Sequence, residues 1–213
     1  MFPAMLRMDD VDTLVVGGGP VAARRAGTLV KHGARVSVVS PSLCDDLRRM
    51  VDSGTTRWHA RPYERGDAEG RRLVVAATDS CETNAAIADA ARAAGAWVNV
   101  ADDASLGDLH FPAATTRGRL TIAVATDGVS PLVSRRIRER VETEYGDEFA
   151  GLLDLLADAR EEARDRIDTQ PARRRFYEDV LNSDARDSLR AGRPNDARAR
   201  VSEILADHAG RQA

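Results

Sequence analysis

The chain has 213 residues, a formal net charge of −3 and an apolar content of 43%. This length allows one large domain and a smaller appendage, and the weakly acidic balance argues against a dedicated nucleic-acid-binding protein. The two cysteines, Cys44 and Cys81, lack partners at metal-ligand or disulfide spacing. No segment has the length of a membrane span or the pattern of a signal peptide. We therefore expect a cytoplasmic protein with no resident metal and no membrane or nucleic-acid partner.

The first half alternates short apolar segments with longer segments that begin with proline or a polar residue and end before glycine. The apolar segments predict buried strands, and His59 is expected on an edge strand. The longer segments predict helices, because proline favours the first helical turn and glycine follows the last. The predicted strands are 13–16, 35–39, 73–77 and 97–100, and the predicted helices are 20–32, 41–52 and 81–94. This order predicts an α/β fold, a Rossmann-like parallel sheet with helices on both faces.

The second half has a different pattern. Residues 110–116 and 119–126 predict an antiparallel β-hairpin, and Ser130 with Pro131 predicts the start of a helix that runs toward Tyr145. The remaining residues predict three or four short helices. We therefore expect a Rossmann domain over 1–109, a hairpin dimerisation region over 110–145 and a small helical domain over 146–213.

A glycine-rich turn follows the first predicted strand and opens the first predicted helix. Gly17, Gly19 and Ala22 occupy the three small-residue positions of a dinucleotide-binding fingerprint. The first lets the chain turn, the second lets the backbone approach the pyrophosphate, and the third lets helix and strand pack closely. The helix N-terminus also favours phosphate charge. The cofactor contacts predicted here are Gly17, Gly18, Gly19, Pro20 and Val21.

The second strand ends without the acidic residue that commonly binds the adenosine ribose. It is followed by Ser40, Pro41 and Ser42, and either serine hydroxyl could bind a ribose hydroxyl. Neither hydroxyl would repel a 2′-phosphate as an aspartate does. The choice between NAD and NADP therefore stays open on these residues.

Five further motifs occur in order. They are 74–79 with Asn84, then 98–103, 111–114, 119–124 and 128–133 with Ile137, Arg138 and Glu142. Together with the glycine turn, these motifs resemble the precorrin-2 dehydrogenase family of the siroheme synthase N-terminal type. The similarity spans roughly residues 2 to 145.

The resemblance implies an NAD-dependent enzyme that oxidises precorrin-2 to sirohydrochlorin in siroheme biosynthesis and acts as a homodimer. It places the cofactor on residues 17–21 and on Pro41 and Ser42. Its catalytic aspartate corresponds to Asp102, and Asp103 is the alternative if the register differs by one residue. Thr78 and Asn99 are added as cofactor contacts, because ligands of such sheets bind at the carboxyl ends of strands.

Precorrin-2 carries eight carboxylates, so its site needs cations and hydrogen-bond donors. The resemblance to a tetrapyrrole enzyme therefore indicates that hydroxyl and arginine side chains in the hairpin and the helix after it bind the substrate. The predicted substrate contacts are Thr126, Ser130, Arg117, Arg135 and Arg138, with Arg119 and Arg136 nearby. Asp127 stands where the family commonly has glycine, and we expect it to point to solvent in a turn. His110 is considered as a cleft residue, although a lone histidine usually has a structural role.

Two alternatives stay open on the sequence. The enzyme could also insert ferrous iron into sirohydrochlorin, with Asp102 serving both steps. A protein of another class, a non-catalytic NAD-sensing module, would also use a short Rossmann domain. Such a module is less favoured, because it has no need for the motifs at 99–102 and 111–114.

Overall fold

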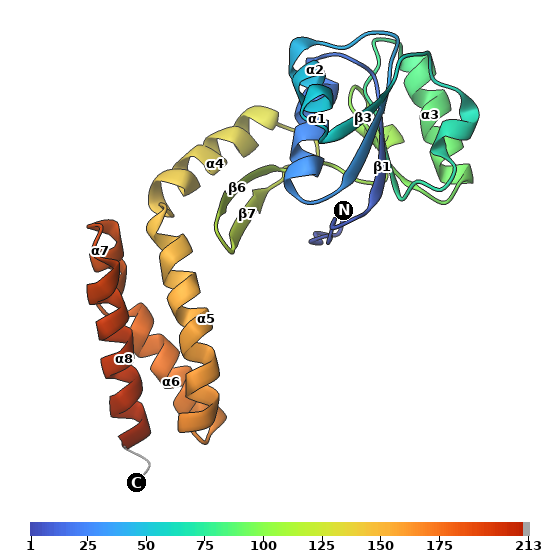
Figure 1. The fold of residues 1–213 in the computed structure, drawn as a ribbon. Coiled ribbons are helices and arrows are strands. Elements are labelled where there is room, and N and C mark those ends of the chain that lie inside the picture. Colours follow the sequence, from blue (N-terminus) through green and yellow to red (C-terminus); the bar gives the residue numbers. More distant parts are fainter. Residues whose placement is uncertain (211–213) are drawn as a thin grey trace. The chain divides into compact units, whose positions relative to one another are not determined.

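A computed structural model describes residues 1–210. The chain divides into two compact units, Met1–Phe111 and Pro112–Ala213 (Figure 1). Each unit has a core of its own, and each is described separately below.

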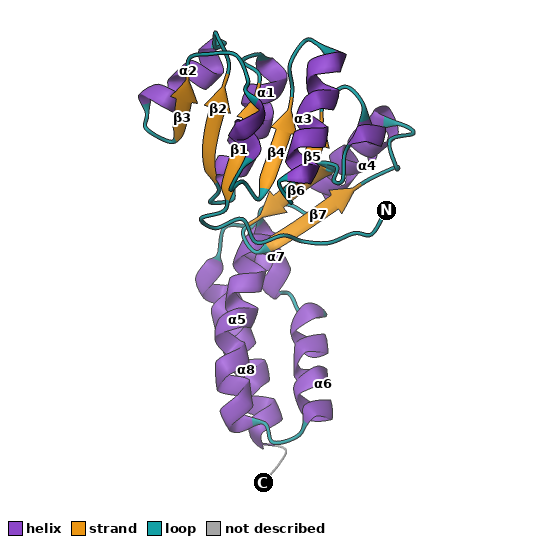
Figure 2. Ribbon diagram, turned by 90° about the vertical axis from the view of Figure 1, so that its right-hand side faces the viewer, coloured by secondary structure: helices purple, strands orange, loops and turns teal. Residues whose placement is uncertain are grey.

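The first unit is built on a five-stranded parallel sheet in the order β3-β2-β1-β4-β5 (Figure 2). The strands are β1 (Asp12–Val16), β2 (Arg35–Val39), β3 (Thr56–His59), β4 (Leu73–Ala76) and β5 (Trp97–Val100). The helices are α1 (Pro20–Lys31), α2 (Asp45–Asp52) and α3 (Cys81–Ala93), with short 3₁₀ turns η1 (Arg65–Ala68) and η2 (Ala104–Leu106). The predicted Rossmann-like class is confirmed, and β3 is the predicted edge strand that carries His59.

Both faces of the sheet are buried, which explains why its strands are almost continuously apolar. Successive side chains of a strand point to opposite faces. Leu14 of β1 therefore packs in one core with Ile87 of α3, and its neighbour Val15 packs in the other core with Leu29 of α1. The helices thus lie on both sides of the sheet, as the sequence predicted.

The helix predicted over 41–52 begins later than expected, at Asp45. Residues 40–44 instead form a loop against the glycine turn. In this loop the Cys44 amide donates to the Gly18 carbonyl at 2.7 Å, and the Ser40 hydroxyl donates to the Ser42 carbonyl at 2.8 Å. The prediction of a helix from Pro41 was wrong because the local bond at Ser40 and the tertiary bond from Cys44 to the glycine turn hold the segment in a bent, non-helical loop.

The second unit begins with the antiparallel hairpin of β6 (Ala113–Arg117) and β7 (Leu120–Val124), which confirms the predicted hairpin. Helix α4 (Pro131–Glu144) follows, and the Ser130 hydroxyl accepts from the Val133 amide as the predicted cap. The tail contains α5 (Glu148–Arg166), α6 (Gln170–Leu181), α7 (Ala185–Arg190) and α8 (Pro194–Gly210). Over the described residues the tail therefore has four helices, of which α5, with 19 residues, is longer than predicted.

The tail helices share a buried core centred on Phe176, with Leu152 of α5 and Leu205 of α8. His208, to which the sequence assigned no role, lies at its edge. Its Nε2 is 2.7 Å from a carboxylate oxygen of Asp179, and its ring meets Phe176 edge-on. The apolar side chains of the tail are thus sufficient to form the core of a small helical bundle.

Across residues 1–210, no helix combines the length and the apolar character needed to cross a membrane.

A buried carboxylate joins the helices of the second unit. The side chain of Glu148, only 6% exposed, accepts hydrogen bonds from Arg186 and Arg190 of α7. Burial would raise the pKa of Glu148, but the bonds from Arg190, its own amide and Arg186 outweigh it and hold this pKa below the ordinary 4.5. The ionised form therefore stabilises the fold.

We predict that Glu148→Gln destabilises the protein by about 1–3 kcal/mol at neutral pH, because two guanidinium groups lose their shared anion. The stabilisation is present above about pH 4.5 and is lost as the pH falls through the lowered folded-state pKa, so the difference between wild type and variant should shrink at lower pH. Thermal unfolding between pH 3 and 8 measures it. Glu178→Gln, which removes an exposed partner of Arg174, is the matched control and should change stability by less than about 0.5 kcal/mol.

Candidate functional site

The glycine turn between β1 and α1 lies against two other loops. Gly17 has φ +123°, and a Cβ there would lie 2.1 Å from the Ala77 carbonyl oxygen. At Gly18 a Cβ would lie 1.8 Å from the Ser42 carbonyl oxygen. Both positions therefore exclude any side chain. The packing role of Gly18 was not anticipated from the sequence, because Ser42 is distant along the chain.

Gly19 differs from Gly17 and Gly18. Its φ of −86° is accessible to any residue, and a Cβ there would meet open space. It is the N-cap of α1, with no side chain bonded to the first-turn amides, and Pro20 occupies the first turn. Free first-turn amides next to open space fit the pyrophosphate of a dinucleotide. Val21, 39% exposed, lies in the same turn.

The loop after β2 contains the three predicted residues Ser40, Pro41 and Ser42. The Ser40 side chain is 6% exposed and its hydroxyl is bonded to the Ser42 carbonyl, while its own carbonyl accepts from the Trp58 indole at 2.9 Å. Pro41 and Ser42 are exposed. Of the two serine hydroxyls, that of Ser42 is thus the accessible one for a ribose.

The sheet order changes direction between β1 and β4, and the carboxyl ends of these strands form the usual ligand crevice of such a fold. Thr78 follows β4, and Asp102 follows β5. Asn84 of α3, whose side chain is fully buried, joins them. Its amide nitrogen donates to the Thr78 carbonyl at 3.1 Å and to Asp102 Oδ1 at 2.9 Å. Its oxygen accepts from the Thr78 amide at 3.0 Å and hydroxyl at 2.8 Å.

Sequence reasoning gave Asn84 no role beyond membership in a motif. Its position four residues after the Ser80 cap of α3 was the only available signal. The sequence does not show that the Thr78 and Asp102 segments both meet at Asn84.

Asn99 lies within β5, paired with Val75, and is 4% exposed. Its amide nitrogen donates to the Leu109 carbonyl at 2.9 Å, while its Oδ1 is buried with no protein partner. The bond fastens the segment after η2 to the sheet. Its observed contact is therefore structural, and any cofactor contact would have to reach the buried oxygen.

The neighbouring aspartates have different environments. The Asp103 carboxylate accepts from the Ser105 hydroxyl at 2.6 Å and amide at 2.8 Å, which holds the pKa of Asp103 below its ordinary value. Asp102 is exposed, with one oxygen bonded to Asn84. The Asp102 carboxylate also raises the pKa of the Cys81 thiol beside it. Asp103 thus caps η2, whereas Asp102 faces solvent at the edge of the sheet.

The ring of His110 binds the backbone of the preceding 3₁₀ turn: its Nε2 donates to the Ala104 carbonyl oxygen at 3.0 Å. Within the described part of the chain, no group of three or more His, Cys, Asp or Glu side chains is arranged to hold a metal ion.

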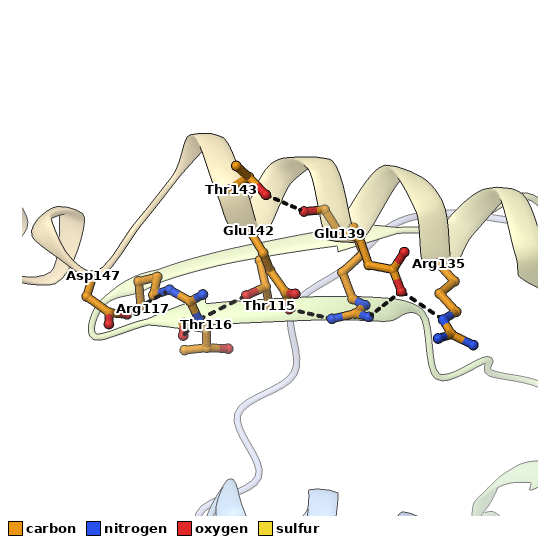
Figure 3. A network of polar contacts seen from close by, with 9 residues as sticks. Thr115, Thr116, Arg117, Arg135, Glu139, Glu142, Thr143 and Asp147 are labelled. Atoms are coloured by element: carbon orange, nitrogen blue, oxygen red, sulfur yellow. Dashed lines mark hydrogen bonds and ion pairs between the residues drawn. The ribbon is translucent and has the colours of Figure 1, made fainter.

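The arginines predicted to meet substrate all lie in the second unit, and each contacts a carboxylate (Figure 3). Arg117 Nε lies 2.9 Å from Asp147, and Arg135 donates to Glu139 at 2.8 Å. Arg138 of α4 binds Glu142 one turn further along the helix. Outside this set, Arg119 donates to Asp154 at 3.0 Å. The predicted anion-binding arginines are therefore partly neutralised by their own unit.

Thr126 and Ser130 also have local partners. The Thr126 hydroxyl donates to the Ser130 carbonyl at 3.1 Å, lies 3.0 Å from the Ser134 hydroxyl and accepts from the Ser130 amide. These bonds fix the turn that leads into α4. Any substrate contact by these hydroxyls would use capacity left after the turn is formed.

Asp127 lies in the same turn and is exposed, with φ +50°, and Gly128 follows at φ +80°. The Val129 amide closes the turn on the Thr126 carbonyl at 2.9 Å. Positive φ at both central positions explains a preference for glycine there, and aspartate tolerates this conformation better than most residues. The expectation that Asp127 points to solvent in a turn is confirmed.

Three family models match the chain. The model described as "Putative NAD(P)-binding" matches residues 4–113, the model of the sirohaem biosynthesis protein central region matches 117–144, and that of the sirohaem synthase dimerisation region matches 148–205. The dimerisation model thus covers residues that the sequence analysis assigned to the helical domain.

Relatives of known name agree with these matches. The siroheme synthase of Methylococcus capsulatus is 41% identical over 99% of this chain, and that of Xylella fastidiosa is 38% identical over 97%. The chain spans 44% of the length of each of these relatives. A solved structure of SirC, a precorrin-2 dehydrogenase, is 26% identical, has a TM-score of 0.76, and is covered completely by 95% of this chain.

The open space at Gly19 and the contact at Gly18 predict opposite effects of substitution. We expect Gly19→Asp to fold with nearly unchanged melting temperature and to weaken NAD binding at least 100-fold, because a carboxylate would occupy the place of the pyrophosphate. Gly18→Ala should lower the melting temperature clearly, because its methyl group collides with a backbone carbonyl. Thermal unfolding and fluorescence titration with NAD measure the two effects. Tight NAD binding by folded Gly19→Asp would show that the turn is not the pyrophosphate site.

Proposed function

We propose that this chain, which belongs to the siroheme synthase family of NAD(P)-binding proteins, oxidises precorrin-2 to sirohydrochlorin with NAD as the hydride acceptor. The observation that carries the proposal is the exposed Asp102 carboxylate at the carboxyl edge of β5, held by buried Asn84. It lies on the same edge of the sheet as the uncapped glycine turn. The activity named for the similar SirC structure fits this pairing of a carboxylate with a nucleotide-binding turn.

When bound, NAD would supply the hydride acceptor, and the chain's own residues would bind and orient it. Gly19 and the first turn of α1 are suited to the pyrophosphate, and the exposed Ser42 hydroxyl to a ribose. Thr78 places its backbone at the crevice between β1 and β4. Because no acidic side chain follows β2, these residues do not repel a 2′-phosphate.

Dehydrogenation removes a hydride and a proton from neighbouring substrate atoms. In our proposal Asp102 accepts the proton, because one of its oxygens is bonded to Asn84 and the residue is exposed. Asp103 is unsuited to this role, since its carboxylate is bonded to Ser105 within η2. A single positioned carboxylate is enough for general-base assistance.

To bind these arginines, the carboxylates of the substrate would have to replace the protein carboxylates that already pair with them. Arg135 is 71% exposed, and an exposed ion pair such as its pair with Glu139 contributes only about 0–1 kcal/mol. Arg138 and Arg117, each 26% exposed, are more enclosed by their own unit. We propose that Arg135 exchanges most readily, and that Arg117, Arg138, Thr126 and Ser130 mainly shape the rim that meets the substrate.

We also propose a homodimer. The apolar hairpin residues Leu120, Ile122 and Val124 of β7 are half-buried within the subunit, because β7 packs on α4. In the second unit, a group of exposed large apolar side chains lies before and on α4: Val129, Leu132, Val133 and Ile137. A second subunit covering this group would remove apolar surface from water.

The two alternatives fare differently. A purely NAD-sensing module is disfavoured, because the similar proteins are named for enzymes of siroheme biosynthesis. Iron insertion into sirohydrochlorin has no observation of its own in the described residues, so it is an outcome to be tested rather than a second proposal.

We predict that Asp102→Ala lowers the single-turnover rate of precorrin-2 oxidation by roughly 10²-fold or more while NAD affinity stays nearly constant, because a positioned base is lost. Asp102→Asn separates the roles: it stays slow if Asp102 takes the proton, and it recovers much of the rate if the side chain only orients substrate. Asp103→Ala should reduce the rate far less, with a small loss of stability from the uncapped η2. Full activity of both Asp102 variants would remove this residue from the mechanism.

We predict that Ile137→Glu converts the dimer to a monomer at micromolar concentration, because a charge would enter the apolar contact. Light scattering of the full chain measures the mass. Leu181→Glu is the comparison variant, since Leu181 is 56% exposed on α6, inside the segment matched as the dimerisation region. Dissociation by Leu181→Glu alone would move the interface to the tail helices, and a monomeric wild type would reject the dimer.

A further inference from the structure

Asn84 uses its full hydrogen-bonding capacity. A primary amide has two N–H donors and two acceptor lone pairs. In Asn84 both acceptor positions are taken by the Thr78 amide and hydroxyl, one donor by the Thr78 carbonyl, and the other by Asp102. The side chain is completely buried, so water does not compete for these bonds.

Three of the four bonds fix the orientation of the amide before Asp102 is considered. They join Asn84 to the backbone and hydroxyl of Thr78, directly after β4. Because the amide is held in this way, the orientation of its remaining N–H is fixed. This N–H points to Asp102 Oδ1, which lies 2.9 Å from the Asn84 nitrogen.

This remaining bond acts on a carboxylate that would otherwise turn freely. Asp102 is exposed, and an exposed aspartate has several accessible rotamers. A bond from a rigid, buried donor selects one of them and occupies Oδ1, which leaves Oδ2 as the oxygen to meet a reacting group. The buried N–H needs an acceptor for its own sake, since an unpaired buried donor costs about 1–3 kcal/mol.

We propose that Asn84 is the positioning residue for the catalytic carboxylate: it fixes Asp102 relative to the Thr78 loop of the cofactor crevice, so that Oδ2 faces the substrate. This proposal rests on the proposed function, because it assigns Asp102 the role of base. Asn84 itself touches neither substrate nor cofactor in this account. It acts through Asp102, as supporting residues of active sites commonly do.

The neighbouring thiol supports the same arrangement. Cys81 lies at the start of α3, and the nearby Asp102 carboxylate raises the pKa of its thiol, so the thiol stays protonated. Helix α3 therefore carries both the amide that binds the carboxylate and a neutral thiol beside it. Because Cys81 is exposed and Asn84 is buried and oriented, the amide is the stronger constraint.

The test is a double-mutant cycle on the single-turnover rate. Asn84→Asp keeps the size of the side chain and an acceptor for the Thr78 amide and hydroxyl. As a carboxylate it loses both N–H donors, the one to Asp102 and the one to the Thr78 carbonyl, and it brings a second negative charge against Asp102. We expect it to slow oxidation by about 10-fold or more in the wild-type background and by less than about 2-fold in the Asp102→Ala background. An equal loss in both backgrounds, or no loss in the wild-type background with the fold intact, would overturn the proposal.

Asn99→Asp is the matched control, because Asn99 is also a buried asparagine but its amide binds a backbone carbonyl. Any loss that it causes should be the same in both backgrounds. NAD affinity of Asn84→Asp, measured by titration, should change less than about 3-fold, since an effect through the Thr78 loop alone would instead weaken cofactor binding.

A second measurement does not depend on turnover or on the folding of an Asn84 variant. In ¹H–¹⁵N spectra of the full chain, Asp102→Ala should shift the side-chain amide signals of Asn84 and speed their hydrogen exchange. The same signals should stay unchanged in Asp103→Ala. Unchanged Asn84 signals in Asp102→Ala would refute the contact. A wild type that fails to oxidise precorrin-2 would refute the proposed function and with it the role of Asn84 as a positioning residue. If the Asn84 signals still respond to Asp102→Ala, the contact itself would stand.

Discussion

The turn after β1 passes between two backbone carbonyls with no room for a side chain, and the geometry of the candidate site depends on this close approach. The absent Cβ of Gly17 makes room for the Ala77 carbonyl, and that of Gly18 for the Ser42 carbonyl. The start of α1 is thereby fixed against the ends of β4 and β2. Because Thr78 follows Ala77 directly, the same contact sets the position of the Thr78 loop, to which Asn84 is bonded. Packing of the glycine turn against two other backbone segments thus leads through the buried Asn84 amide to the Asp102 carboxylate.

Charge has a different role in each unit. In the first, the groups at the sheet edge are few: an uncapped helix end that favours anions and a carboxylate held by neutral donors. In the second, the predicted substrate arginines have carboxylate partners within the same unit, and the buried Glu148 carboxylate binds two arginines of α7. A polyanionic substrate would have to replace the carboxylates that already pair with these arginines. It would therefore gain only the difference in binding free energy between the new ion pairs and the existing ones. In the proposed function, recognition by these arginines would depend on which ion pairs are exposed enough to exchange, and Arg135 is the most exposed of the three.

The strands, the helix ends and the hairpin were predictable because each depends on local pattern and on proline, serine and glycine at fixed places. The i to i+4 spacing also predicts the ion pairs of Arg135 with Glu139 and of Arg138 with Glu142. The sequence analysis interpreted these arginines only as substrate contacts. The sequence did not predict that α2 begins at Asp45, that the Ser40 hydroxyl is already hydrogen-bonded, or that Asn84 binds Asp102. The start of α2 and the role of Asn84 depend on segments that meet only in the folded sheet: the Gly18 carbonyl at Cys44, and Thr78 with Asp102 at Asn84. The bond from the Ser40 hydroxyl to the Ser42 carbonyl is local, but the sequence pattern does not specify it.

The central claim is that one chain combines a nucleotide-binding turn with a carboxylate base to oxidise a tetrapyrrole. The most direct measurement mixes the purified wild-type chain with precorrin-2 and NAD, without iron, and follows NADH and sirohydrochlorin by their absorbance in the same sample. The account predicts that both appear together, one NADH for each sirohydrochlorin, and that neither appears when NAD is omitted. NAD binding without any conversion of precorrin-2, under conditions where the substrate is intact, would contradict it.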